Sequence, residues 1–367
     1  MKVIVVGGGI IGCAAAYELA KAGCAVTLFE RATPGSEASG AAAGILAPLG
    51  AGGPSHFEDL AIASWRLYPK IAVELRERTG IDVEYVTRGT IYPLFTAQNV
   101  RHAEARATRP SAREFGIEAW DANEARDREP ALSTKVRGAM FIKGCHWVNN
   151  QRLTVAYAQA AAALGVILRS GDTVSRVLVE DGRSRGIVAE GERFESDVVL
   201  LAAGAWTGEL AATFGARLPV QPKRGQMLAL HQVPPVITHC VQADDVYLVP
   251  RPSGELLIGA TVERVGFQRA VTAEGISGLL RAAIDLVPSL ADLPILRTWC
   301  GFRPWAPDNL PILGPWPRAE GLFVATAHFR NGIMLAPITA KLMTQWILQG
   351  RPSMAVKPFL PDRFLKG

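Results

Sequence analysis

Hydrophobic residues in the first thirty positions form two short apolar runs that flank a longer stretch of helical composition. Residues 3–6 are β-branched, residues 11–22 are rich in alanine, and residues 25–29 are again apolar. Gly23 directly follows the middle stretch, at a position where glycine commonly ends a helix. The pattern predicts a strand, a glycine turn, a helix and a second strand that ends at Glu30.

Two later parts of the chain return to this alternation of strands and helices. Residues 151–168 predict a helix closed by a glycine, with a strand after it. Residues 172–206 alternate like a short antiparallel meander and end in a buried strand, residues 198–201, with a turn at Gly204. Residues 321–348 again predict strand, loop and helix. We therefore expect one α/β domain that is built from three separated segments.

Two strand-rich inserts lie between these segments. Residues 83–95 and 136–142 predict strands of the first insert, with a charged helical stretch between them. Residues 224–230 and a hairpin over residues 246–260 belong to the second insert, and Pro252-Ser253-Gly254 provides the hairpin turn. Together the inserts predict one antiparallel sheet that lies over the cofactor.

The predicted fold class is α/β with an α+β insert: a Rossmann-like domain under an antiparallel substrate-binding sheet. A chain of 367 residues is longer than most single cores, which agrees with two domains. The predicted boundaries assign residues 1–84, 148–218 and 300–367 to the nucleotide domain, and residues 85–147 and 219–299 to the substrate domain.

The first turn carries the spacing G-x-G-x-x-G at Gly7, Gly9 and Gly12. Gly7 allows a tight turn, Gly9 lets the backbone approach a pyrophosphate, and Gly12 permits close packing of helix and strand. Glu30 is placed to accept hydrogen bonds from ribose hydroxyls. The motif predicts a dinucleotide, NAD or FAD, and the run of small residues over 35–46 favours a flat wall against a ring system.

Composition narrows the class of protein. Hydrophobic residues make up 49% and charged residues 20%, which is typical of a globular enzyme, and the net charge of +5 comes from interleaved charges. This charge pattern favours a solvated surface over nucleic-acid binding. The five cysteines and six histidines lack metal-ligand spacing, and no long apolar span is present. We expect a cytoplasmic protein with neither metal nor membrane contact.

Three polar side chains stand in apolar surroundings: Tyr247, Arg303 and Arg330. Each arginine alone is about as consistent with an internal salt bridge as with a substrate contact. As a trio they predict a clamp for a carboxylate, because a guanidinium matches a carboxylate in two-point contact. Pro337 predicts a helix that starts near Ala336, whose free N–H groups would face a cofactor or simply solvent.

Several of these segments together resemble the D-amino-acid oxidase (DAO) superfamily of FAD-dependent oxidoreductases. They are GGGIIG with Glu30, SGAAAGIL, VYLVPR, GFRPWAPDNLPILG and HFRNGIMLAP. Within the superfamily the chain is most similar to the ThiO-type glycine oxidases of thiamine biosynthesis. The resemblance covers essentially the whole chain. The glycine motif is shared with many flavoproteins, whereas HFRNG followed by an apolar turn and proline is far more specific.

The resemblance implies contacts to non-covalently bound FAD and to substrate. Besides Gly7, Gly9, Gly12 and Glu30, the residues implied in FAD binding are Ile10, Ile11, Arg31, Ala38, Ser39, Ala43, Gly44, Ile45, Val174, His328, Phe329, Asn331, Gly332, Ile333 and Met334. It also implies that Arg303 and Arg330 bind the substrate carboxylate and that Tyr247 assists. Cys300 lies near the place where related sarcosine oxidases attach flavin covalently, although a buried thiol is the commoner outcome.

The implied chemistry is hydride transfer from the Cα of glycine to flavin N5. Dioxygen then gives hydrogen peroxide, and the imine hydrolyses to glyoxylate and ammonia or is captured by a thiazole synthase. The family also suggests a homo-oligomer. Alternatives are a sarcosine or D-amino-acid oxidase, a dehydrogenase of the same superfamily, and a non-catalytic dinucleotide-binding protein. An NAD dehydrogenase is disfavoured by the three-segment domain.

Overall fold

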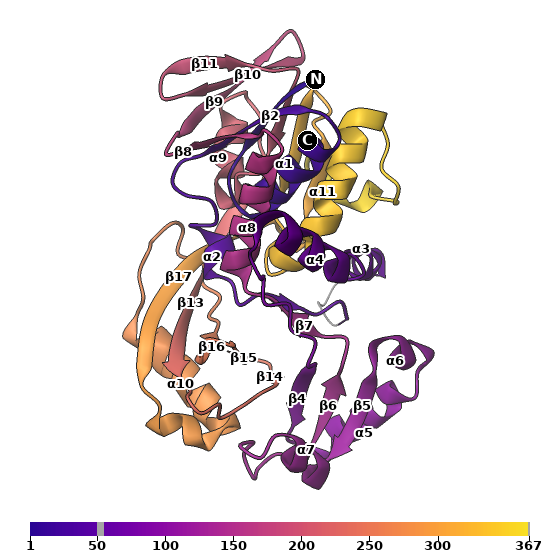
Figure 1. Cartoon of the computed structure of the whole chain (residues 1–367), viewed down its shortest axis with the longest axis vertical. Helices are drawn as coiled ribbons and strands as arrows, with labels where there is room; N and C mark the ends of the chain where they lie inside the picture. The colour runs from indigo at the N-terminus through magenta and orange to yellow at the C-terminus, as the bar shows by residue number, and fades with distance from the viewer. Residues whose placement is uncertain (50–54, 366–367) are drawn as a thin grey trace.

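The computed structural model describes residues 1–49 and 55–365, and a six-stranded sheet organises one half of the molecule. Its strand order is β18-β19-β12-β1-β2-β8, and all neighbours are parallel except β18 and β19. The strands are β1 (Lys2–Val6), β2 (Ala25–Glu30), β8 (Ile167–Ser170), β12 (Val198–Leu201), β18 (Ile312–Pro315) and β19 (Leu322–Thr326). Figure 1 shows indigo, magenta and yellow segments gathered in this half, so three distant parts of the chain build it.

Both faces of this sheet are covered, because its strands are apolar on each side. Val3 and Val5 pack toward helices α1 (Ile10–Lys21), α8 (Asn150–Ala163) and α11 (Gly332–Gln349). Ile4 and Val6 pack toward the opposite layer. That layer is the predicted meander, here β9 (Val174–Glu180), β10 (Arg183–Ala189) and β11 (Glu192–Glu195), together with α9 (Thr207–Ala212) and η1 (Gly204–Trp206). The alternation of a strand therefore divides the core into two layers.

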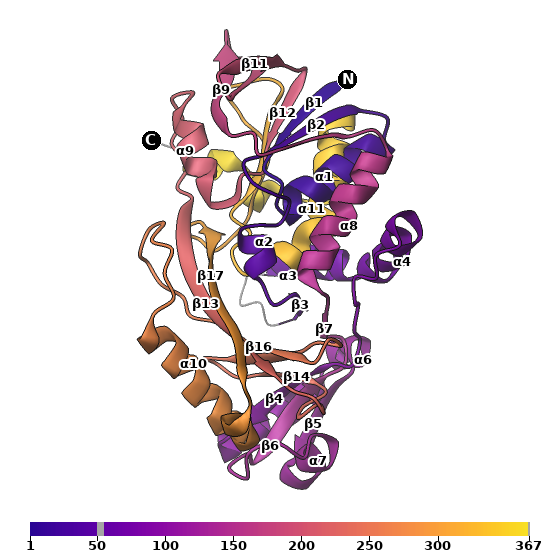
Figure 2. The ribbon, with the colours of Figure 1, turned by 60° about the vertical axis from the view of Figure 1, so that its left-hand side comes forward.

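An eight-stranded sheet organises the other half, in the order β17-β13-β16-β15-β14-β4-β6-β5 (Figure 2). The strands are β4 (Thr90–Leu94), β5 (Ile117–Asp121), β6 (Gly138–Ile142), β13 (Gln221–His231), β14 (Cys240–Gln242), β15 (Tyr247–Pro250), β16 (Glu255–Gly259) and β17 (Ile295–Trp305). The prediction of a wholly antiparallel sheet is wrong at one seam, because β14 and β4 pair in parallel. This parallel pair joins the first insert, which contains β4, to the second insert, which contains β14. The two inserts leave the first sheet at separate points of the chain. β17 runs through the boundary predicted at residue 300.

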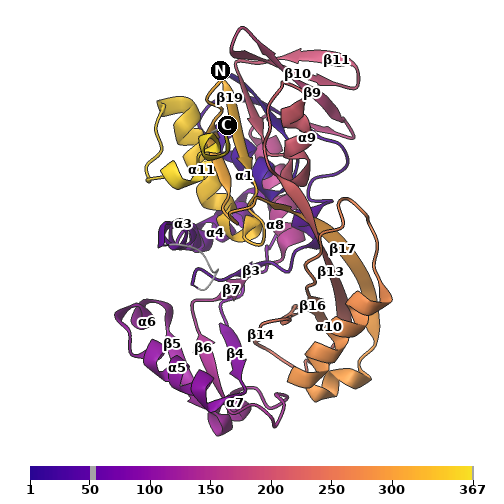
Figure 3. The ribbon, with the colours of Figure 1, turned by 180° about the vertical axis from the view of Figure 1, so that it is seen from behind.

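The first insert departs from its predicted strands. The strand predicted over residues 83–95 is limited to β4, because Glu84 and Gly89 have positive φ and interrupt extended backbone. β5 was missed inside the charged stretch, whose helices are α5 (Ala97–Ala107), α6 (Pro110–Phe115) and α7 (Ala122–Arg128). Figure 3 shows this insert beside the second one from behind.

The remaining elements connect and cover the two halves. They are α2 (Ala38–Ala41), β3 (Ile45–Leu46), α3 (Ser55–Trp65), α4 (Tyr68–Thr79), β7 (His146–Trp147), α10 (Ala273–Leu286), η2 (Pro288–Asp292), η3 (Lys357–Phe359) and η4 (Pro361–Phe364). In the part of the chain that the structure describes, no helix has the length and apolar character to cross a membrane.

Helix α11 begins at Gly332 rather than near Ala336, so the predicted start is wrong, and Pro337 lies inside the helix. Proline has no N–H, which leaves the Ile333 carbonyl without its helical partner. The Tyr68 hydroxyl donates to that carbonyl, and the Ser64 hydroxyl donates to the Met334 carbonyl at 2.6 Å. The helix therefore passes through the proline because two buried side chains replace the lost contacts.

We predict that Tyr68→Phe lowers the free energy of unfolding by about 1–3 kcal/mol, because it leaves the buried Ile333 carbonyl unpaired. Urea denaturation of the purified protein measures this change. In a Pro337→Ala background the new N–H restores the helical bond, so Tyr68→Phe should then cost much less. Equal costs in the two backgrounds would contradict this account.

His146 predicts a loss of stability in mild acid. Burial lowers the pKa of His146 to about 4, and its Nδ1 lies 2.6 Å from the Tyr85 hydroxyl. Unfolding restores a pKa near 6.5, so the unfolded chain binds the extra proton between about pH 6.5 and 4. We expect the free energy of unfolding to fall with pH in this window, by up to about 1.4 kcal/mol per pH unit from this group. Urea titrations at several pH values measure how steeply the free energy of unfolding changes with pH. This dependence should be weaker in His146→Gln. The control is His102→Gln, at an exposed position, which should keep the dependence of the parent protein.

Candidate active site

A cavity of about 700 Å³ lies where the carboxyl ends of β1, β2, β12 and β19 meet the eight-stranded sheet. Ligands of open α/β sheets bind at this edge, because the loops that follow neighbouring strands converge there. The predicted cofactor residues line the cavity, with Gly12 and Met334 as the two that do not. Gly12 packs behind the first turn, and Met334 is buried inside α11.

The first turn shows why its glycines are needed. Gly7 has φ of +108°, and a Cβ there would lie 2.5 Å from the Ala202 carbonyl oxygen. A Cβ at Gly12 would overlap the Gly7 carbonyl oxygen. Gly9 precedes α1 without any side-chain cap, and the Ile10 N–H donates to the Ser39 hydroxyl at 2.9 Å. The amino terminus of α1 therefore faces the cavity, with the Ser39 hydroxyl at its first N–H and no side-chain cap from Gly9.

The carboxylate at the end of β2 is held rigidly. One oxygen of Glu30 accepts from the Gly8 N–H at 2.7 Å, and the other accepts from the Ala32 N–H at 2.9 Å. Arg31 next to it pairs with Glu37 at 2.6 Å and lies 3.7 Å above the Trp206 ring. Glu30 keeps further lone pairs for hydroxyl donors at the edge of the cavity.

The turn from β19 into α11 lines the cavity with backbone. Asn331 precedes the helix without capping it by a side-chain hydrogen bond, so the first N–H groups remain available. Burial lowers the pKa of His328 to about 3, and its Nε2 lies 3.1 Å from the Thr339 hydroxyl. His328 is therefore neutral and supports the turn. The sequence placed this helix terminus four residues too late but beside the correct cavity.

A buried arginine braces the small-residue wall. Arg251 follows β15 and donates to the carbonyls of Val148 at 2.6 Å and Ala43 at 2.9 Å, and to the Asn150 side chain at 2.9 Å. Burial lowers the pKa of Arg251 to about 10. The wall is tight: a Cβ at Gly301 would lie 2.5 Å from the Ala41 Cβ. Arg251 ends the segment VYLVPR, but its role was not predicted, because its partners are neutral carbonyl and amide oxygens distant in the sequence.

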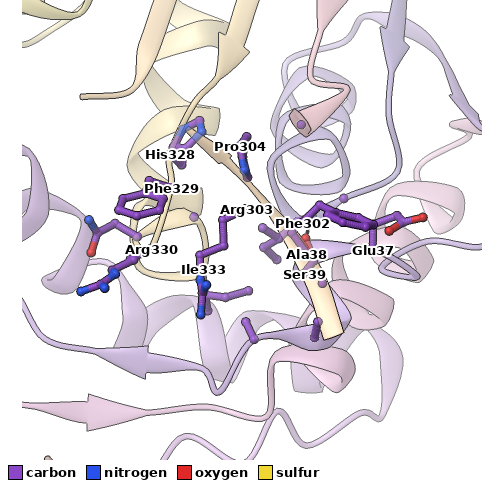
Figure 4. Close-up of a pocket in the computed structure, with 18 of the residues that line it drawn as sticks. Glu37, Ala38, Ser39, Phe302, Arg303, Pro304, His328, Phe329, Arg330 and Ile333 are labelled. Atoms are coloured by element: carbon purple, nitrogen blue, oxygen red, sulfur yellow. Dashed lines mark hydrogen bonds between the residues drawn. The ribbon is translucent and has the colours of Figure 1, made fainter. Parts of the chain in front are cut away.

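The three predicted clamp residues line one cavity. Arg303 is half-buried on β17, and its Nη1 donates to the Thr261 carbonyl at 2.9 Å. Burial raises the pKa of the Tyr247 hydroxyl, while the charges of Arg303 and Arg330 oppose that rise. In the view of Figure 4, Arg303 extends between Arg330 and the segment of Ala38 and Ser39. The three side chains are therefore close enough to act on one anion.

Two glycines make room for this clamp and were not recognised in the sequence. A Cβ at Gly225 would overlap the Arg303 guanidinium, and a Cβ at Gly259 would lie 2.7 Å from the Tyr247 hydroxyl. Both lie inside strands, β13 and β16, where glycine otherwise weakens a sheet. A glycine within an apolar strand was the sequence signal that could have indicated space for a neighbouring side chain.

Arg330 is exposed, although the apolar segments on either side of it in the sequence suggest a buried side chain. Phe329 before it has φ of +50°, and this left-handed residue turns the chain so that Arg330 leaves the core. Its guanidinium lies 5.4 Å from the Phe329 ring centroid and forms no ion pair with a described acidic residue. A cation at the open side of the cavity is well placed to meet an anion that enters.

Further lining residues come from loops, strands and helices that carried no recognisable motif. At one end they follow β8 and β12, and at the other they belong to the substrate domain; they include Asp172, Thr173, Ala203, Gly204, Trp206, Tyr92, Arg106, Met140, Gln242 and Asp245. Cys300 is not among the lining residues, although Gly301 and Arg303 beside it are. Gly204, predicted as a turn, marks the loop after β12.

The lining fits a flavin dinucleotide on four independent observations. The uncapped amino terminus of α1 suits a pyrophosphate, and Glu30 suits ribose hydroxyls. The wall of small residues accepts a flat ring, and the uncapped amino terminus of α11 suits negative charge at the edge of that ring. Among the described residues there is no group of three or more potential metal ligands.

Comparison with known proteins agrees with this geometry. Residues 2–346 match the family described as DAO, FAD dependent oxidoreductase. The chain is 36% identical to a glycine oxidase of Geobacillus kaustophilus over 99% of this chain and 97% of that protein. A crystal structure of glycine oxidase from Geobacillus kaustophilus superposes with a TM-score of 0.93, over 98% of both chains.

Two further relatives carry other names. The bifunctional protein ThiO/ThiG of Trichormus variabilis is 36% identical over 99% of this chain, which spans 55% of that protein. The hydrogen cyanide synthase subunit HcnC of Pseudomonas aeruginosa is 32% identical over 99% of this chain and 96% of that protein. The family match over most of the chain and these full-length similarities lead to one conclusion: this protein belongs to the DAO family of FAD-dependent oxidoreductases.

Proposed function

We propose that this protein oxidises the Cα–N bond of glycine, with FAD as cofactor and dioxygen as the final electron acceptor. The observation that carries the proposal is the clamp of Arg303, Tyr247 and Arg330 in the same cavity as the amino terminus of α11. The names of the glycine oxidase relatives support this substrate. The overall reaction is glycine, dioxygen and water to glyoxylate, ammonia and hydrogen peroxide.

Arg303 is the principal carboxylate ligand in this mechanism. Its guanidinium is held by the Thr261 carbonyl and offers its remaining N–H groups to the cavity. Tyr247, whose raised pKa keeps the hydroxyl protonated at neutral pH, donates a further hydrogen bond. Arg330 adds a second positive charge from the open side. Arg303 and Tyr247 would orient the carboxylate, and Arg330 would add charge, so that Cα is presented toward the cofactor side of the cavity.

Bound FAD supplies a two-electron acceptor that dioxygen can regenerate. The residues proposed to hold it are those of the α1 turn, Glu30, the wall at Ala38–Ala41 with Ala43 and Gly44, Val174, and the turn over residues 328–333. The amino terminus of α11 would stabilise negative charge on the bound cofactor. Because Cys300 does not line the cavity, we propose that attachment is non-covalent.

Discrimination among small amines is weak at such a site. An extra methyl group changes transition-state binding by about 1–3 kcal/mol when it only crowds an apolar surface. Tyr247 and Met227, whose Sδ lies 3.7 Å from the Tyr247 hydroxyl, provide that surface. Sarcosine and small D-amino acids are therefore the alternative substrates, and a quinone-linked dehydrogenase is the alternative to an oxidase.

The relatives also suggest where the product goes. In the ThiO/ThiG relatives the segment similar to this chain spans only about half of a longer bifunctional protein. We therefore propose that the imine is handed to a separate thiazole synthase, as part of thiamine biosynthesis. The HcnC relatives are named for a different product, hydrogen cyanide.

Anaerobic addition of glycine to the FAD-loaded protein tests the reaction. We expect the visible flavin absorption to bleach, and admission of air to restore it with release of hydrogen peroxide. A flavin that stays oxidised with glycine but bleaches with sarcosine or a D-amino acid would reassign the substrate. Restored colour that requires a quinone rather than air would reassign the enzyme as a dehydrogenase.

Arg303→Met is predicted to raise the KM for glycine by about 100-fold or more while FAD stays bound. The variant removes a charged two-point contact, and each hydrogen bond to a charged group contributes about 1.5–3 kcal/mol. Steady-state kinetics with a parallel flavin absorption spectrum measures both properties. The matched control is Arg297→Met on the same strand, because Arg297 pairs with Glu255 and does not line the cavity. Similar kinetics for the two variants would remove Arg303 from the clamp.

Gly259→Ala is predicted to displace the Tyr247 hydroxyl, because the new methyl group would lie 2.7 Å from it. We expect a loss of at least tenfold in kcat/KM for glycine with little change in FAD content. Gly278→Ala on α10 is the control, since a Cβ there meets no neighbouring atom. A Gly259→Ala enzyme with normal kcat/KM would show that the position of Tyr247 is unimportant.

A further inference from the structure

A continuous row of side chains crosses the eight-stranded sheet at the level of Tyr247. Gln242 pairs with Tyr247, and Tyr247 pairs with Gly259 on the next strand. On the other side of Gln242 lies β4, where Ile91 pairs with Val241 of β14. The next residue of β4, Tyr92, therefore lies beside Gln242, and Tyr92 pairs with Met140 on β6. Directly paired residues present their side chains on the same face. All five line the cavity, so the row forms its floor.

The clamp occupies only part of this floor. Glycine is small, and its carboxylate is assigned to Tyr247, Arg303 and Arg330. Beyond Tyr247 the floor continues over three more strands, β14, β4 and β6, the last two of which belong to the first insert. We call this part the outer subsite. It is defined by four lining residues: Tyr92, Arg106, Met140 and Gln242. A bound glycine would leave it unfilled.

Gln242 brings an unsatisfied polar group to the outer subsite. Its side-chain oxygen is buried and has no hydrogen-bond partner in the structure. A buried polar atom without a partner costs about 1–3 kcal/mol, so such groups are normally satisfied by water or by a ligand. Since the oxygen and nitrogen of a carboxamide exchange by rotation, Gln242 is able to donate a hydrogen bond as well as accept one.

Arg106 brings an unpaired positive charge to the same place. It lies in the last turn of α5, is half-buried, and lines the cavity. Its side chain forms no hydrogen bond or ion pair with the side chains that the structure describes, which leave out residues 50–55, 110, 111, 366 and 367, and none of those residues is acidic. Its charge acts on Tyr92, where it opposes the rise in the pKa of the hydroxyl that burial causes.

Two acidic residues that line the cavity near Gln242 do not neutralise this site. Asp244 and Asp245 line the cavity in the turn between β14 and β15, but both are exposed, and neither lies within ion-pair distance of Arg106. Exposed charges are screened by solvent and salt, whereas a half-buried cation is screened less. The outer subsite therefore offers a guanidinium and a carboxamide to a group with acceptor oxygens.

We propose that the outer subsite binds a second carboxylate, carried on the nitrogen or the side chain of the substrate. The substrate class is then an amino acid with a distal anion, such as a glycine whose nitrogen carries a carboxyalkyl chain. Tyr247 and Tyr92 are two interstrand spacings apart, about 10 Å, so the chain between the two anions contains several carbons. This inference rests on the clamp of the proposed function and extends it.

Binding of unreactive carboxylates to the FAD-loaded protein tests the subsite without turnover. Matched pairs differ only in a terminal methyl or carboxylate group: butyrate and succinate, valerate and glutarate, hexanoate and adipate. The perturbation of the flavin absorption spectrum gives each Kd. We expect at least one dicarboxylate to bind tenfold or more tightly than its monocarboxylate partner. Equal or weaker binding of all three dicarboxylates would overturn the proposal and leave the outer subsite as solvent space.

Variants then locate the second anion. Arg106→Gln should reduce the advantage of the dicarboxylate at least fivefold, and Gln242→Leu should reduce it by a smaller factor. Arg101→Gln, at an exposed position of the same helix, should leave the advantage as in the parent protein. An advantage that survives Arg106→Gln would place the second anion elsewhere, for example at Arg330.

The two proposals fail in different ways. If glycine does not bleach the flavin but the dicarboxylate preference depends on Arg106, the reaction assignment is wrong and the outer subsite stands. If glycine bleaches the flavin and no dicarboxylate preference exists, the reaction stands and the outer subsite is excluded. If neither carboxylate of any pair perturbs the flavin, the clamp itself is wrong, and the outer subsite falls with it.

Discussion

The buried guanidinium of Arg251 holds the two halves of the molecule in register. It extends from the hairpin of the substrate sheet to the Val148 and Ala43 carbonyls and the Asn150 side chain of the nucleotide half. Burying a charge is costly unless its donors are satisfied, and here three neutral acceptors satisfy them. Loss of any acceptor would leave a buried cation unpaired, so the geometry of the small-residue wall and of the sheet above it is coupled.

Near Arg251, the part of the cavity proposed to hold the cofactor is formed by backbone groups more than by polar side chains. Two helix amino termini, those of α1 and α11, open into the cavity without side-chain caps. Their N–H groups stay available because glycine or a left-handed turn brings the chain to each helix, and because Tyr68 and Ser64 stabilise α11 around its proline. The packing that tolerates Pro337 therefore lies directly behind the part of α11 that faces the cofactor.

On the substrate side, the sheet itself sets the chemistry. Gly225 and Gly259 have no side chain and leave space for Arg303 and Tyr247. In each case a glycine on one strand makes room for a functional side chain on the neighbouring strand. The same cross-strand row continues to Gln242 and Tyr92, which connects the clamp to polar groups that glycine alone does not need. A sheet floor of this kind lets one fold change its substrate by single substitutions along a row.

The sequence by itself determined the three-segment nucleotide domain, the first glycine turn, the meander and the hairpin, because periodicity and turn residues act locally. The residue types of Tyr247, Arg303 and Arg330 also led to the prediction that these three side chains bind one carboxylate. Only the tertiary structure decided that α11 begins at Gly332, that Arg330 is exposed, and that β14 and β4 pair in parallel. The helix start and the parallel pairing depend on partners more than 100 residues away, such as Tyr68 against Ile333, and no local pattern encodes such contacts. The exposure of Arg330 depends on the left-handed backbone of Phe329, a conformation that the residue type does not predict.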